Sequence, residues 1–409
     1  MPVPSLPLEL VSLVLTQLGA SCDEDDQVQE AKSRRENGLS IALVCKAWRS
    51  LGEAFVWHDL VLDSPAATRR ATQHFRVYPH HLQLVRDFVL RDGADPSADT
   101  AGGLLSSWRS QRPNPAEEII ALWSAGPVLK QLLFEAPSWV DHDQLLYAML
   151  DLDNLQHLYG LALVLGQATD PTLENALILS YVSRLRHLRV LVLVLDFAGV
   201  RWITLPSIRP PSQLQPLSTL YLSLASQDST DTRRKETFAY LLDFVRPPTL
   251  TSLALFLEPD DSAIVATLAR FSNLAEIETW FDNVNRCGPL IQHLFAVLAA
   301  LSPPHLSLGI KARPPEQRFP LPGFDTLPVL LGAIPSSVKS LKFNNVYLAA
   351  TAASLPPVIA DKPNEADVGT TLKVLLDLGD GEGPVEHVLV KLTDGSWRTV
   401  KSEKEGEAK

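Results

Sequence analysis

The side chains that could support catalysis or metal binding are few and form no strong motif. Asp141, His142 and Asp143 are consecutive and offer two carboxylates and an imidazole, which in principle could hold a metal ion. Aspartate is also favoured where a helix begins, and an apolar helical pattern follows, so we interpret this run as a helix start. His80 and His81 form the other conspicuous polar cluster. The chain has no HExxH, no GxSxG and no GxGxxG after a strand.

Neither the cysteines nor the glycine-rich loop adds a catalytic or cofactor site. Cys22, Cys45 and Cys287 are far apart and form no CxxC pair, which indicates unpaired thiols in a reducing compartment. The glycine-rich segment 379–384 contains no GK[ST] and precedes no predicted helix, so it does not predict a phosphate-binding loop. We therefore expect no enzymatic activity, no cofactor and no bound metal.

Composition and charge narrow the class of protein. Hydrophobic residues make up 46% of the 409 residues, enough to bury a core over most of the chain. A formal net charge of −11 opposes general nucleic-acid binding, because the phosphate backbone is negative. The apolar runs are far shorter than the roughly 20 residues of a membrane span, and the N-terminus lacks the basic flank of a secretory signal. We expect a soluble protein of the cytoplasm and/or nucleus, with neither nucleic acid nor membrane as partner.

Two apolar segments near the N-terminus predict helices. The first covers residues 8–18, with Pro7 at the first turn, where a missing N–H costs nothing. Two apolar stripes run along this helix: Leu10, Val14 and Leu18, and beside them Leu8, Val11 and Leu15. The second segment has helical spacing at Ile41, Val44, Cys45 and Trp48. Stripes on two faces need two covering surfaces, one within the module and one on a partner.

The order of three residue clusters resembles an F-box, the helical module that binds a Skp-type adaptor. The clusters are the Leu-Pro start at residues 6–7, the run from Leu43 to Arg49, and the run from Phe55 to Leu60. The resemblance implies an adaptor-contacting face made of Leu6, Pro7, Leu10, Val14, Leu18, Val44, Cys45 and Trp48. Residues 19–38 form a longer insert than the family usually has, and its acidic run at 23–26 is interpreted as a solvated loop. The alternative is an ordinary helical cap on a repeat array.

From Trp57 onward, a short apolar motif recurs about every 30 residues. Apolar residues occupy its first, fourth and sixth positions, as in Leu188-x-x-Leu191-x-Leu193. We place the central residue of eight successive copies at Leu132, Leu158, Leu191, Leu220, Leu253, Ile277, Leu306 and Leu341. One short strand per unit at this period resembles a leucine-rich repeat.

Helical patterns separate the predicted strands. They cover residues 143–150, 171–188, 233–245, 262–271 and 289–301. This alternation predicts an α/β fold with parallel strands, and the resemblance implies an irregular leucine-rich-repeat solenoid with a parallel concave sheet. Ala225, Asp196 and Glu258 stand where the family has Asn or Cys, so no continuous Asn ladder is expected. A non-repeating α/β domain is the alternative.

Side chains between the repeat leucines point away from the core, because side chains alternate along a strand. We therefore expect Tyr159 and Tyr221 to share one column of the concave face, and Phe256 and Trp280 the neighbouring column. Exposed aromatic side chains are good anchors for a protein partner, so these four are the candidate target-binding residues. Partial cover by loops or the C-terminal tail is the alternative. The run from Arg233 to Lys235 is expected on a helix surface, with solvated charges.

These patterns divide the chain into four parts. Residues 1–62 form the F-box-like module, with a flexible insert at 19–38, and residues 57–354 form the repeat-like body. Residues 355–400 form a linker and a hairpin of two apolar runs, 372–378 and 385–392. Residues 401–409 form a charged, disordered tail.

The resemblance also implies a function. The chain resembles an F-box protein of the fungal type. Such a protein would be the substrate-receptor subunit of an SCF-type, cullin–RING ubiquitin ligase. The F-box would bind a Skp-type adaptor and through it a cullin, and the repeats would bind an unidentified target protein. The alternative function is a non-catalytic interaction scaffold whose F-box-like cap recruits no ligase.

Overall fold

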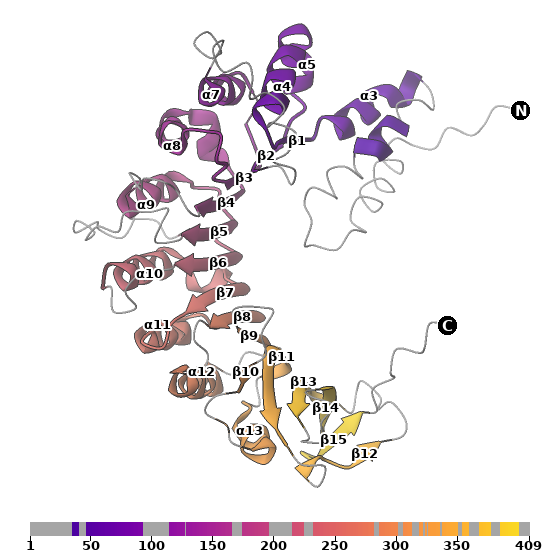
Figure 1. The fold of residues 1–409 in the computed structure, drawn as a ribbon, viewed down its shortest axis with the longest axis vertical. Helices are drawn as coiled ribbons and strands as arrows, with labels where there is room; N and C mark the ends of the chain where they lie inside the picture. The colour runs from indigo at the N-terminus through magenta and orange to yellow at the C-terminus, as the bar shows by residue number, and fades with distance from the viewer. Residues whose placement is uncertain are drawn as a thin grey trace, which may run out of the picture. The chain divides into compact units, whose positions relative to one another are not determined.

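The fold is mixed α/β, with a large and mostly parallel sheet (Figure 1). The computed structural model describes residues 35–40, 46–92, 114–126, 128–165, 174–195, 215–224, 232–281, 286–301, 306–312, 319–321, 324, 326–335, 338–350, 354–359, 368–377 and 385–400. They group into two compact units. The boundary falls between strands β4 (Gly160–Leu165) and β5 (Val190–Leu195), and helix α9 (Asn175–Arg184) is divided between the units.

In the first unit, helix α3 (Lys46–Val56) is followed by alternating strands and helices. The strands β1 (Asp59–Leu62), β2 (Asp87–Leu90), β3 (Gln131–Glu135) and β4 are parallel neighbours in chain order. The other helices are α4 (Pro65–Val77), α5 (Pro79–Leu82), α7 (Pro115–Ala125), α8 (His142–Asp151) and the 3-10 helix η2 (Asp153–His157). The strand register aligns Leu60, Phe88, Leu132 and Leu161 in one buried row.

Side-chain caps fix where three of these helices begin. Ser64 Oγ accepts a hydrogen bond from Ala67 N before α4, and Asn114 Oδ1 accepts one from Ala116 N before α7. Asp141 Oδ1 accepts one from Gln144 N at 3.1 Å. Each cap satisfies a backbone N–H that has no partner within its own helix. The interpretation of the Asp141 run as a helix start is therefore confirmed.

In the second unit, strand–helix alternation continues from β5 to β11. The strands β5, β6 (Thr219–Leu224), β7 (Ser252–Leu257), β8 (Glu276–Phe281), β9 (Leu306–Ala312) and β11 (Val338–Ala349) are successive parallel neighbours. The helices are α10 (Thr232–Phe244), α11 (Ser262–Thr267), α12 (Gly288–Leu301) and α13 (Leu327–Ala333), with 3-10 helices η3 (Pro247–Thr249) and η4 (Leu268–Arg270). The short β10 (Phe319–Pro320) pairs with β11. Helices α10, α11 and α12 lie along one side of the strands (Figure 1).

One buried residue per strand forms a continuous core row in this unit. The row comprises Leu191, Leu220, Leu253, Ile277, Leu308 and Leu341. Two predicted central positions are therefore wrong: β4 contributes Leu161 rather than Leu158, and β9 contributes Leu308 rather than Leu306. All four leucines are buried, so hydrophobicity could not distinguish them. Backbone pairing decides the register.

The C-terminal strands extend the same sheet. Strand β13 (Val368–Asp377) is parallel to β11 and antiparallel to β14 (Val385–Leu392). Strand β15 (Trp397–Val400) is antiparallel to β14, and β12 (Val358–Ile359) is parallel to β15. The two apolar runs expected to form a hairpin lie mainly in β13 and β14, but β13 also adds to the repeat-like strands rather than standing apart from them.

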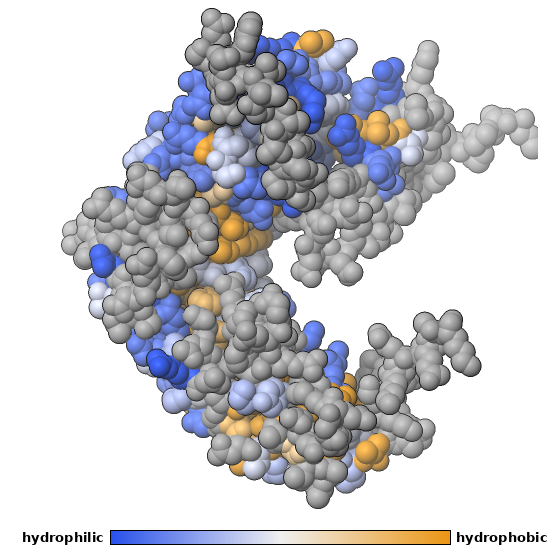
Figure 2. Space-filling model, in the orientation of Figure 1, coloured by the Kyte–Doolittle hydropathy of each residue, from blue (hydrophilic) through white to orange (hydrophobic). Residues whose placement is uncertain are grey.

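Most predicted helices are present, and helices α4, α5, α7 and α13 were not predicted. The patterns at 143–150, 233–245, 262–271 and 289–301 are confirmed by α8, α10, α11 with η4, and α12, and α9 lies within 171–188. In α4 the buried side chains are Thr68, Thr72 and Phe75, so its apolar periodicity is weak. Its surface is mostly hydrophilic (Figure 2). No helix in the described ranges is long and apolar enough to cross a membrane.

Candidate protein-binding face and pocket

The predicted adaptor-contacting face falls almost wholly outside the described residues. Leu6, Pro7, Leu10, Val14, Leu18, Val44 and Cys45 all lie there. Trp48 lies in α3, but its side chain is also outside the description. The adaptor face therefore stays a prediction.

The face of the sheet opposite helices α10, α11 and α12 carries no helix among the described residues of the second unit, and we call it the helix-free face (Figure 1). It carries two columns of side chains that the register defines. One column is rich in hydroxyl groups: Thr219, Ser252, Glu276, Ser307, Ser340 and Thr371. The next runs through Tyr221, Ala254, Glu278, Gly309, Lys342 and Lys373. Within the first column, Ser252 Oγ donates to Glu276 Oε2 at 3.1 Å. The face is therefore polar, with an aromatic group at β6 and two exposed lysines at β11 and β13.

The hydroxyl-rich column was missed by sequence reasoning, which searched for aromatic and charged anchors. Each of its residues directly precedes a core residue of its strand, so the repeat alignment contained the signal. Serine and threonine are small and common, and single occurrences carry no weight. Their alignment becomes visible only when the register of the strands is known.

Tyr159 and Tyr221 do not occupy equivalent positions, which corrects the predicted column. Tyr221 lies between the buried Leu220 and Leu222 of β6 and is half-buried. Tyr159 precedes β4, and its N–H donates to Lys130 O at 2.8 Å. Within β4, Ala162 lies between the two core leucines, opposite Leu133 of β3. The extra residue in this copy of the motif causes the shift. The Tyr159 side chain is 50% exposed.

Phe256 and Trp280 are brought together by the register, but they differ in exposure. They are direct neighbours across β7 and β8. Phe256 is only 5% exposed, so it cannot serve as an exposed anchor in this conformation, whereas Trp280 is half-buried. Among the predicted target-binding residues, Tyr221 and Trp280 are thus the two that share this face with accessible surface, and Tyr159 is accessible in the first unit.

Arg234 is buried, contrary to the expectation of a solvated helix surface. Its side chain is fully buried, and Nη2 lies 2.5 Å from Asp261 Oδ1 and 3.4 Å from Glu258 Oε2. Nη1 donates to Leu224 O at 3.2 Å, and Glu258 N donates to Asp261 Oδ2 at 2.8 Å. This network ties the C-terminal ends of β6 and β7 to α10. Its residues are paired with each other, which favours a structural role.

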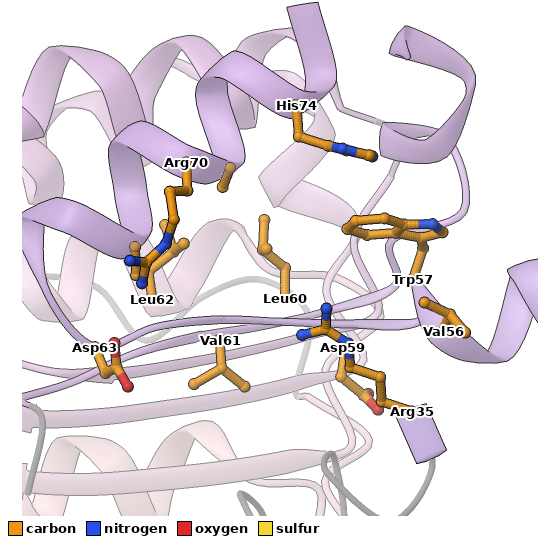
Figure 3. A pocket seen from close by; sticks show the side chains of 12 residues that line it. Arg35, Val56, Trp57, Asp59, Leu60, Val61, Leu62, Asp63, Arg70 and His74 are labelled. Atoms are coloured by element: carbon orange, nitrogen blue, oxygen red, sulfur yellow. The ribbon is translucent and has the colours of Figure 1, made fainter. Parts of the chain in front are cut away.

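A pocket of about 500 Å³ lies along β1 in the first unit (Figure 3). Residues from both faces of β1 line it, including Asp59 and Leu60, because β1 has a strand neighbour on one edge only among the described residues. Arg70 and His74 of α4 line one wall, and Arg35 lies at the opposite end beside Asp59 (Figure 3). Sequence reasoning did not detect this pocket, because its residues come from three separate segments of the chain.

A cluster of aromatic rings borders this pocket. Trp57 stacks on His74 with ring centroids 4.3 Å apart and on His81 at 5.0 Å. His74 Nε2 and His81 Nδ1 lie 2.9 Å apart, which requires one nitrogen to donate a proton and the other to accept it. Burial lowers the pKa of both histidines, and the charge of His80 lowers both further. The His80 ring is tilted against that of His81, with centroids 4.2 Å apart, so both histidines noted in the sequence belong to this cluster.

One group of side chains among the described residues has the spacing of metal ligands. It comprises His58, Asp59 and Asp87, at the N-terminal ends of β1 and β2, and their donor atoms all lie within 4.8 Å of one another. The group does not include the Asp141 run that sequence reasoning had considered.

No protein-family model matches the chain, and a search of curated proteins finds no match. Its functional interpretation therefore depends on its own residues and fold.

Proposed function

We propose that this chain is the substrate receptor of an SCF-type ubiquitin ligase, acting in the cytoplasm and/or nucleus. Residues 1–62 would bind a Skp-type adaptor, and through it a cullin. The helix-free face of the sheet would bind a target protein. The chain would contribute no catalytic residue. Its contribution would be proximity, because holding a target near the ubiquitin-charged enzyme raises its effective concentration there.

We further propose that each unit is an irregular leucine-rich-repeat array. Support comes from the core row, in which one leucine or isoleucine per strand, from Leu191 to Leu341, pairs with its counterpart in the next strand. A solenoid is expected to repeat one strand and one helix in each copy of its motif. The repeats differ in length, as in the longer motif before β4, and this makes the array irregular.

The observation that carries the proposal is the succession of two features along the chain. An F-box-like residue order occupies the front, and a parallel ladder follows whose helix-free face presents Tyr221, Trp280 and paired columns of polar side chains. Aromatic groups in a polar surround are typical of protein-binding surfaces. The alternative, a scaffold that recruits no ligase, would have the same target-binding face. It would differ only in that its F-box-like front does not bind an adaptor.

Adaptor binding provides the decisive test. Tagged full-length chain should co-purify with a Skp-type adaptor at moderate salt. Leu10→Lys combined with Trp48→Ala should abolish this binding while the circular-dichroism spectrum stays folded. Val77→Lys is the matched control, because Val77 is 66% exposed on α4 and should tolerate the same charge. Absence of adaptor from the wild-type preparation would reject the ligase proposal and leave the scaffold.

Target capture tests the second half of the proposal. Tyr221→Ala with Trp280→Ala should reduce the yield of proteins captured by affinity purification and mass spectrometry, and adaptor binding should be unchanged. Tyr147→Ala is the control, since Tyr147 is 57% exposed on α8 rather than on the helix-free face. Unchanged capture by the double variant would show that this face does not bind targets.

A further inference from the structure

Three donor side chains converge where β1 and β2 begin. His58 Nδ1 lies 2.9 Å from Asp59 Oδ1 and 3.5 Å from Asp87 Oδ2. In a tetrahedral zinc site with bonds of about 2.0–2.1 Å to nitrogen and oxygen, neighbouring donor atoms are about 3.3 Å apart. The two measured separations lie on either side of that value. The side chains are largely shielded, with 33%, 10% and 20% of their surface exposed for His58, Asp59 and Asp87.

Strands hold the two carboxylates, and His58 lies in the bend directly before β1. Asp59 and Asp87 are direct partners in the parallel register of β1 and β2, so their carboxylates emerge side by side on the same face. The carbonyl oxygen of His58 accepts hydrogen bonds from both Arg86 N, at 2.8 Å, and Asp87 N, at 3.1 Å. These bonds anchor His58 to the start of β2. Donor groups placed by strands rather than by loops need little rearrangement to bind an ion.

Like charges directly opposite one another on adjacent strands destabilise a sheet. The carboxylates of Asp59 and Asp87 are opposite one another in this way, so a cation held between them stabilises the pairing of β1 with β2. Arg35 lines the same pocket as Asp59 and is one possible source of positive charge, and a metal ion is another.

We propose that His58, Asp59 and Asp87 bind a divalent transition-metal ion, with Zn²⁺ as the best chemical match. His58 Nδ1 supplies the nitrogen ligand, and the two carboxylates balance the double positive charge of the ion. Imidazole nitrogen and carboxylate oxygen are established zinc ligands, whereas Mg²⁺ and Ca²⁺ prefer oxygen alone. Three protein ligands leave one coordination position open. Because Asp59 lines the pocket along β1, a ligand in that pocket could reach this position. Zinc binding by these side chains is a property of the chain alone and does not depend on the proposed function.

The test is a zinc titration of the full-length chain after a chelator has removed bound metal. Isothermal calorimetry measures the binding, and the titration is repeated with Co²⁺ as a spectroscopic probe. Wild type should bind one ion at this site. Asp87→Asn and His58→Gln should each weaken that binding by about tenfold or more, since even changes outside the ligand set cost 10- to 100-fold. Asp63→Asn is the matched control, because Asp63 lines the same pocket but is not in the cluster. His81→Asn controls for zinc bound by the aromatic cluster.

Three results would overturn the proposal. The first is a folded wild-type chain that binds no zinc. The second is wild-type affinity in both Asp87→Asn and His58→Gln. The third is an equal loss in the control Asp63→Asn or His81→Asn, which would assign the binding elsewhere. Two ligand variants are used so that a folding defect in one does not decide the outcome.

Discussion

Replacing Arg234 by methionine should strongly destabilise the second unit. Arg234 and Asp261 are both fully buried and paired at 2.5 Å, and Glu258 is nearly as buried. Methionine fills similar space but leaves the Asp261 carboxylate without its cation. Removing one partner of a buried ion pair costs about 3–5 kcal/mol, because the remaining charge stays desolvated. With about 2–4 °C of melting temperature per kcal/mol for a unit of this size, the midpoint should fall by about 6–20 °C.

Urea and thermal unfolding of the full chain, followed by circular dichroism, would measure this loss. The matched control is Lys235→Met, the next residue of α10, whose side chain is partly exposed and which should change stability by no more than about 0.5 kcal/mol. Adding Asp261→Asn to Arg234→Met removes the buried carboxylate that has lost its cation. The loss of unfolding free energy in the double variant should therefore be smaller than the sum of the losses in the two single variants. Equal effects of Arg234→Met and Lys235→Met would refute the reasoning, because they would mean that the ion pair contributes nothing.

Two further predictions concern pH and backbone geometry. Burial holds the pKa of His74 and His81 below the ordinary value of 6.5, so the unfolded chain binds protons more tightly than the folded chain. The stability contributed by these neutral histidines is fully present above pH 6.5 and should fall as the pH drops below it. His81→Phe should flatten the dependence of melting temperature on pH between 7 and 5. An unaltered profile would exclude the histidine cluster as the source of that dependence. Gly395 has a φ of 85° in the turn between β14 and β15, so Gly395→Val should cost about 1–2 kcal/mol in urea unfolding, with Gly369→Val, where no positive φ is imposed, as the comparison. Equal losses at the two glycines would argue against backbone strain as the cause at Gly395.

Sequence reasoning succeeded where a signal is local and repeated. Leucines at regular spacing predicted the strands of the second unit, and the apolar helical patterns between them predicted α8, α10, α11 and α12. Asp141 was recognised as a cap because capping depends on one side chain and the next turn of backbone. Such signals do not depend on distant residues, so predictions made from them agree with the structure.

The sequence failed where two interpretations satisfy the same pattern. Leu158 and Leu161 are equally buried, so only hydrogen bonding between β3 and β4 identifies the core position. That choice moves Tyr159 out of the column of Tyr221. Arg234 looks like a surface residue in its charged run, and its burial depends on Asp261, far along the chain. A charged residue is buried only when a partner exists, and partners across strands are invisible in a one-dimensional pattern.

By itself, the sequence determined the α/β alternation, most strand and helix positions, and the resemblance from which the proposed function comes. Tertiary structure decided the register, and through it every candidate site. Asp59 and Asp87 are separated in sequence by a strand, two helices and a turn, yet the pairing of β1 with β2 makes them neighbours. His58 joins them because its carbonyl is anchored to the start of β2. Periodicity specifies which face a side chain occupies, whereas only the hydrogen bonds between strands specify what lies beside it.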